Sequence, residues 1–94
     1  MIVGMCRLDL RLPENGSLKG KRQVLQSIIA HIRKDFNVAV AEVDHQDSWQ
    51  QATLGIVTVS TASDYVHGLL TGVVKMVERG HWAVEVLDYE IEII

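Results

Sequence analysis

The sequence predicts an α+β sandwich, in which one four-stranded antiparallel sheet carries two helices on one face. Four segments read as strands, two segments between them place apolar residues at helical spacing, and the order along the chain is β-α-β-β-α-β. Each helix should link two strands by a right-handed crossover, which places the strands in the order 4-1-3-2. This is the ferredoxin-like arrangement.

Length and composition are those of a single domain over residues 1–94. The apolar fraction is 48% and the charged fraction 22%, which is ordinary for a protein with one hydrophobic core. The lone cysteine, Cys6, allows no disulfide within the chain, and no apolar run has the length of a membrane span. We therefore expect a cytoplasmic protein with no membrane partner.

The first half of the chain predicts a strand, a helix and a strand. Residues 2–12 alternate between apolar and charged side chains, as in a half-buried strand, and the turn residues 13–16 end it. Ser17 is a favourable N-cap for a helix over 18–35, whose apolar residues share one face. The β-branched and small residues of 38–43 predict the second strand.

The second half repeats this pattern in the order strand, helix, strand. After a polar turn, residues 52–60 form the third predicted strand. Ser63 or Asp64 is expected to cap the second helix, Gly80 to stop it, and 82–94 to form a long final strand. The expected core consists of apolar residues from the first strand and both helices: Leu8, Leu10, Leu25, Ile28, Ile29, Ile32, Val66, Leu70 and Val73.

Apolar residues fall on both faces of the predicted sheet. Val3 and Met5 oppose the core residues of the first strand, and the apolar parity of the last strand changes between Val86 and Leu87. One explanation is a β-bulge that switches the parity, together with a few exposed apolar side chains. The other is a partner that covers the face, most simply a second copy of the chain, and we expect a homodimer.

Three cations, Lys19, Lys21 and Arg22, fall in the first turns of the first predicted helix, where the backbone dipole is already positive. They belong to a basic first third of the chain: residues 1–36 carry a net charge of +4, against −7 for the rest. Ion pairs with acidic residues such as Glu42 or Asp44 would explain them. An anion site at the helix start, built from the N–H groups after Ser17 and these cations, would explain them equally.

The predicted topology brings other cations and rings to the same end of the sheet. The turn between the second and third strands and the start of the last strand should lie beside the helix start, adding His45, Trp49, Arg79, His81 and Trp82. Cations next to flat rings suit single-stranded nucleic acid or a nucleotide. Alternatively, the two tryptophans simply cap the core.

The sequence contains none of the usual motifs for catalysis or metal binding. The histidines have no helical i, i+4 pairing and Cys6 lies on an apolar strand face, so we expect no metal site. No Walker loop, dinucleotide-binding glycine motif or nucleophile elbow occurs, and nothing in the sequence activates a carboxylate. We expect no catalytic residue and no cofactor, and favour a protein that is not an enzyme.

The segments 17–22 (SLKGKR), 36–43 (FNVAVAEV), 46–50 (QDSWQ) and 52–55 (ATLG) resemble, in order and spacing, the YlxP-like family of small bacterial proteins. The resemblance implies a ferredoxin-like fold and a bacterial cytoplasmic protein. It implies no activity, because the function of the family is unknown. Its genes often lie near those for translation initiation and ribosome maturation, which points to RNA or ribosomes.

Two functional hypotheses follow from the sequence. The first is a non-enzymatic binding module that acts on RNA or a ribosomal partner through the basic helix start. The second is a homodimeric ligand-binding or scaffolding domain with no nucleic-acid role.

Overall fold

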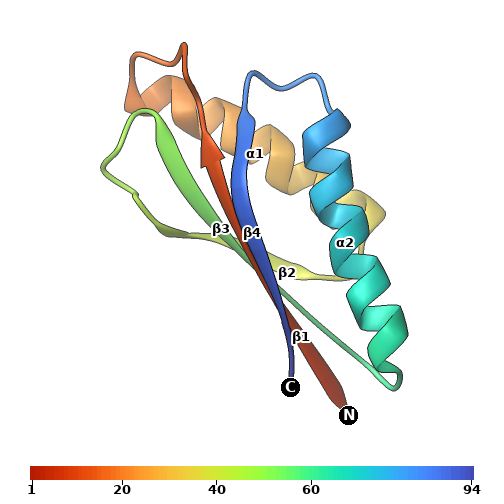
Figure 1. Ribbon diagram of the computed structural model, residues 1–94. Coiled ribbons are helices and arrows are strands. Elements are labelled where there is room, and N and C mark those ends of the chain that lie inside the picture. Colours follow the sequence, from red (N-terminus) through yellow and green to blue (C-terminus); the bar gives the residue numbers. More distant parts are fainter.

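Strand β1 (Ile2–Arg11) lies inside a four-stranded sheet with the order β2-β3-β1-β4 in the computed structural model, which describes residues 1–94. Every neighbouring pair of strands is antiparallel (Figure 1). Strand β3 (Gln51–Ser60) lies beside β1, and the edges are β2 (Ala39–Asp44) and β4 (Glu85–Ile93). The observed order confirms the predicted ferredoxin-like topology.

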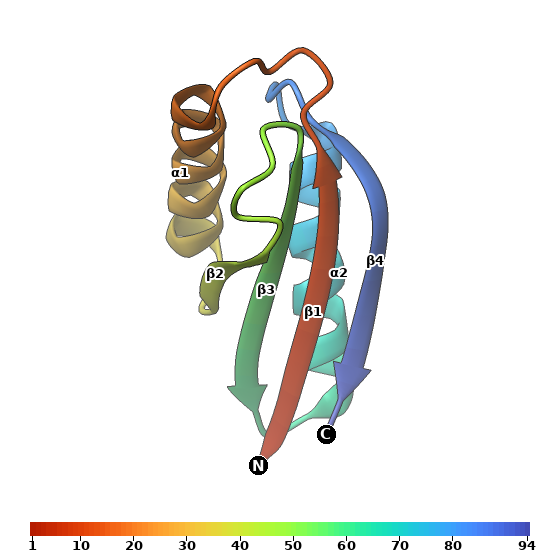
Figure 2. The same cartoon turned by 90° about the vertical axis from the view of Figure 1, so that its left-hand side faces the viewer.

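Helices α1 (Leu18–Asp35) and α2 (Ser63–Arg79) share one core on a single face of the sheet (Figure 2). Sixteen buried apolar residues form this core, drawn from both helices and from β1, β2 and β3. Helix α2 approaches β1 closely at Gly4, where any Cβ would collide with the side chains of Val66 and Leu70. Neither helix is long and apolar enough to cross a membrane.

The ends of α2 differ from the sequence-based expectation. Its N-cap is Ala62, which has no side-chain oxygen, whereas Ser63 and Asp64 already lie in the first turn. Gly80 does end the helix, but with φ −69° rather than in the left-handed conformation. The ring of Trp82 lies against the Gly80 backbone, so a side chain is excluded there by lack of space.

The final strand is shorter than expected and contains a bulge. Strand β4 begins at Glu85 instead of residue 82, because the preceding residues cross the end of the core. The register with β1 shifts between Asp9, which pairs with Asp88, and Leu10, which pairs with Val86. Leu87 is the extra residue, and the bulge therefore accounts for the change of apolar parity in this strand.

Two different surfaces make up the sheet face away from the helices. At the end near the termini, register pairs Val3 with Val59 and Met5 with Val57, and these four residues form what we call the sheet apolar patch. Val57 is 40% and Val59 57% exposed. The other end is charged and mostly acidic, with Arg7, Asp9, Arg11, Glu85, Asp88 and Glu90, whereas Glu92 pairs with Met5 and lies beside the sheet apolar patch.

Eight of the nine expected core residues are buried, and Ile29 is the exception. Ile28 is completely buried, whereas Ile29 lies at the margin of the core and is only partly covered. The two residues are neighbours on α1 and differ by about 100° in direction, which is enough to move one side chain off the buried face.

Replacing Ile28 by Ala should lower the free energy of unfolding by about 3–4 kcal/mol, because it leaves a cavity in a fully packed site. Ile29→Ala is the matched control, with an expected loss of about 1 kcal/mol, since its environment is already open to water. Urea unfolding followed by circular dichroism measures both. Equal losses for the two variants would show that the helix face has been misassigned.

Candidate functional site

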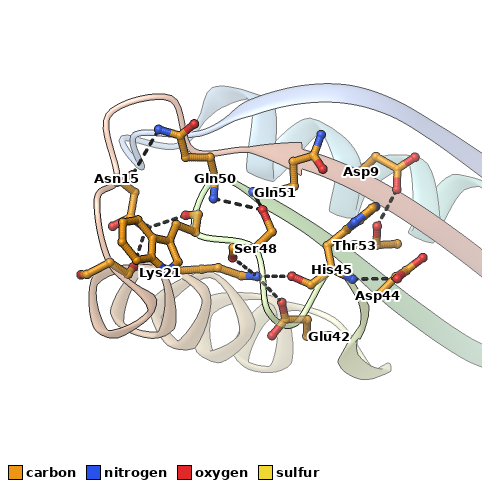
Figure 3. A network of polar contacts seen from close by, with 12 residues as sticks. Asp9, Asn15, Lys21, Glu42, Asp44, His45, Ser48, Gln50, Gln51 and Thr53 are labelled. Carbon is orange, nitrogen blue, oxygen red and sulfur yellow. Dashed lines mark hydrogen bonds and ion pairs between the residues drawn. The ribbon is translucent and has the colours of Figure 1, made fainter.

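Lys21 is the most buried charged residue of the basic helix start, with 2% of the side chain exposed. Its ammonium donates to the carbonyl oxygens of His45 (2.7 Å) and Ser48 (2.8 Å). It also lies 2.8 Å from Oε2 of Glu42 on β2, an ion pair that is largely shielded from water (Figure 3). The ammonium thus donates two hydrogen bonds and is paired with a carboxylate in a buried position, which leaves it unavailable to an external anion.

The Lys21 contacts hold the 45–50 loop against the start of α1, and Asn15 and Gln50 add further hydrogen bonds. Asn15 donates from Nδ2 to the carbonyl oxygens of Ser17 (2.7 Å) and Trp49 (2.6 Å), and Gln50 donates to the Asn15 carbonyl (3.3 Å). Gly20 lies close to this contact, because a Cβ there would displace the Asn15 side-chain oxygen. Much of the SLKGKR segment therefore serves to anchor this loop.

Ser17 acts as the predicted N-cap. Its Oγ accepts from the N–H of Gly20 (3.0 Å), and its carbonyl accepts from the N–H of Lys21 (3.1 Å). One of the N–H groups that the anion-site hypothesis assigned to a ligand is consequently used within the helix.

Lys19 and Arg22 are exposed residues of α1 and lie outside its buried face. Near the other end of the helix, Arg33 and Lys34 are exposed too, and we call these four cations the α1 basic face. None of the four has a carboxylate within ion-pair distance, since only Arg7 and Lys21 form ion pairs in the structure. The helix itself carries a single acidic residue, Asp35, at its last position.

Arg33 has one additional role at the edge of the sheet. Its Nη2 donates to the carbonyl oxygen of Val40 (3.2 Å), on the outer side of β2. A capped edge carbonyl disfavours pairing with a further strand, while the positive charge of Arg33 stays uncompensated.

His45 and Trp49 come from the same loop but lie on different surfaces. His45 has a left-handed backbone conformation (φ 62°), and it lines a pocket on the open sheet face with Asp9, Thr53 and Leu87. Trp49 is 55% exposed and lies next to the start of α1 through the contact of its carbonyl with Asn15. Only Trp49 is therefore placed beside the α1 basic face.

Trp82 lies across the middle of α1 rather than at its start. Its indole N–H donates to Oγ of Ser27 (3.0 Å), and its ring meets the His31 ring edge-on, with centroids 5.2 Å apart. A pocket opens here, lined by His31, Gly80, His81 and Trp82, which we call the aromatic pocket. Arg79 is exposed at the end of α2, directly before this pocket in the sequence.

Several residues of the candidate site were not indicated by the sequence. Asn15, Ser27 and His31 carry no motif that marks them, because their partners lie in other elements. Arg33 and Lys34 contribute to the positive charge of the first third of the chain, and their position on α1 was readable from helical spacing.

Cys6 and the metal-ligating side chains were the other chemical candidates in the sequence. Burial raises the pKa of the Cys6 thiol to about 11, so the thiol is protonated at neutral pH and is a poor nucleophile. Histidine, cysteine, aspartate and glutamate side chains form no group of three or more that could hold a metal ion.

Comparison with known sequences confirms the expected family resemblance. The family model described as "Protein of unknown function (DUF503)" matches residues 3–91. Over 61 residues the chain is 36% identical to "Uncharacterized protein YlxP" of Bacillus subtilis (strain 168). That alignment covers 65% of this chain and 66% of the relative, just under two thirds of its length.

Comparison with solved structures supports the fold. One match is LarC2, the C-terminal domain of a cyclometallase involved in the synthesis of the NPN cofactor of lactate racemase. Its TM-score is 0.54 at 10% identity, covering all of this chain and 55% of that one. The de novo designed protein Foldit4 matches with a TM-score of 0.56 at 11% identity, covering all of this chain and 97% of the other. At such identities the likeness extends to the fold alone.

Replacing Lys21 by Ala should lower the free energy of unfolding by about 3 kcal/mol, because Glu42 and two carbonyls lose their buried partner. Lys19→Ala is the matched control. It removes an exposed cation near the positive end of the helix dipole and should change stability by less than about 0.5 kcal/mol. Urea denaturation provides both values, and a Lys21→Ala protein as stable as the parent would contradict the structural role of this ammonium.

Proposed function

The chain belongs to the DUF503 family of unknown function, and from its own geometry we propose that it is a non-enzymatic module that binds single-stranded RNA on the α1 basic face. The observation that carries the proposal is the absence of any carboxylate partner for Lys19, Arg22, Arg33 and Lys34. Phosphate groups are the ligands that such a row of cations recognises best.

The charge distribution supports this surface over any other. The open sheet face carries mainly carboxylates at its charged end, so an RNA strand is repelled there and attracted to α1. Lys19 and Lys34 are separated by about 22 Å along the helix axis, given a rise of about 1.5 Å per residue. The cations thus lie in two pairs, one at each end of the helix, and the two pairs can contact different phosphates of one strand.

Trp49 favours a single strand over a duplex. Its carbonyl contacts Asn15 next to the start of α1 and the residue is 55% exposed, and an exposed indole stacks on bases that are not already stacked in a helix. A single-stranded loop of ribosomal RNA offers the same chemistry. We therefore expect purified ribosomes to compete with a short RNA strand for this face.

Fluorescence anisotropy of a labelled single-stranded RNA, measured over a range of salt concentrations, tests the proposal. The parent should bind with an affinity that falls steeply with salt, at a log–log slope of about 0.7 per phosphate contacted. The double variant Lys19→Glu/Arg22→Glu should lose most of this binding and flatten the slope, while acidic residues at a helix start leave folding intact.

The control for this experiment is Arg11→Glu/Lys75→Glu, which changes the net charge equally but at exposed positions outside α1. It should retain most of the binding and the slope of the parent. Absence of binding by the parent at low salt, or equal losses in both double variants, would contradict an RNA site on α1.

We infer a second function, association with another copy of the chain, from the sheet apolar patch. Its four side chains are contiguous across β1 and β3, as expected for a surface that a partner covers. Val3 exchanges backbone hydrogen bonds with Ile94 on the β4 side, so the N–H and C=O of Val59, opposite Val3, point toward the β2 side. Strand β2 pairs with β3 only as far as Ala39, opposite Val57, and therefore leaves Val59 without a strand partner.

Light scattering at high micromolar concentration tests the homodimer. The parent should have twice the mass of the chain, and Val59→Lys should convert it to the monomer, because a charge is then buried in the interface. Leu87→Lys is the control, since Leu87 is 52% exposed at the charged end of the same face. A monomeric parent would contradict the homodimer.

A further inference from the structure

Two rings of the aromatic pocket beside α1, those of Trp82 and His31, are oriented by specific contacts. The Trp82 indole is oriented by its hydrogen bond to Ser27 and by its packing against the backbone of Gly80. The His31 ring stands at 80° to it, in an edge-to-face arrangement that aromatic pairs prefer. His81, which is exposed, completes the lining.

The hydrogen bonds also define which ring atoms face a ligand. Nδ1 of His31 lies 2.8 Å from the Ser27 carbonyl oxygen, which can only accept, so Nδ1 is the donor in this hydrogen bond. The indole N–H of Trp82 is already used by Ser27. The pocket is therefore lined by the rings of Trp82, His31 and His81, and no carboxylate lines it.

Two cations are close in sequence to residues that line the pocket. Lys34 follows His31 by three residues on α1, close to one helical turn, and Arg79 directly precedes Gly80 at the end of α2. Neither cation has an acidic partner within ion-pair distance. A planar ring that enters the pocket thus brings its attached phosphates toward cations.

We propose that the aromatic pocket is a base-binding subsite, which receives one unstacked nucleobase of the RNA strand bound on the α1 basic face. This inference rests on the proposed RNA-binding function. Trp49 lies by the start of α1, and Trp82 lies by Ser27 and His31, between Arg22 and Arg33 along the helix, so the two residues can stack different bases of the same strand. Recognition by stacking tolerates any base, because every base has a π-face.

The fluorescence of Trp82 reports directly on this pocket. Trp49→Phe leaves Trp82 as the sole tryptophan and retains a ring at position 49. A single-stranded oligoadenosine RNA should quench its emission, whereas an abasic strand of the same length, which presents phosphates without bases, should bind more weakly and cause no quenching.

His81→Ala should weaken binding of the oligoadenosine about tenfold, as expected for the loss of one stacking side chain. The same variant should leave binding of the abasic strand unchanged. His67→Ala is the matched control, because His67 is an exposed histidine of α2 that does not line the pocket, and it should bind both strands as the parent does.

The outcomes separate the subsite from the RNA-binding function. Anisotropy that shows RNA binding without quenching of Trp82, or with equal affinities for the His81→Ala and His67→Ala proteins, overturns the subsite and leaves the α1 basic face in place. Equal quenching by the abasic strand overturns it as well, because the signal then reports the backbone. No binding of oligoadenosine by the parent at low salt overturns both proposals.

Discussion

The ammonium of Lys21 is the contact on which the geometry of the candidate site depends. A buried charge is costly unless oxygens surround it, and here one carboxylate of β2 and two carbonyls of the 45–50 loop do so. Because these partners lie on β2 and on the loop between β2 and β3, the single side chain of Lys21 joins both to α1. The position of Trp49 beside the helix start is a consequence.

This arrangement divides the cations of the helix start into two classes. Lys21 points inward to Glu42, as the ion-pair explanation of the sequence requires, whereas Lys19 and Arg22 point to solvent without an acidic partner. A rotation of about 100° per residue is enough to send neighbouring side chains to opposite surfaces. The ion-pair and anion-site explanations thus apply to different residues of one short segment.

A bulge in β4 explains why the apolar residues of this strand change parity along the sequence. With Leu87 as the extra residue, Val86 on one side and Ile91 on the other both face the helices, and the acidic residues of β4 face outward. Apart from Leu87, which is 52% exposed at the charged end, the bulge leaves a small group of exposed apolar residues at the other end of the face. The surface that a partner would cover is therefore the sheet apolar patch of four residues, and not the whole sheet face.

By itself, the sequence determined the order and kind of the elements, the strand order, the N-cap at Ser17 and most of the core, because periodicity and capping are local properties. It also determined that the first third of the chain is basic. Tertiary structure decided which cations are free, that His45 leaves the helix start, and that Trp82 forms a pocket with His31. These outcomes depend on side-chain directions and on partners that are distant in the sequence, and no local pattern encodes such contacts.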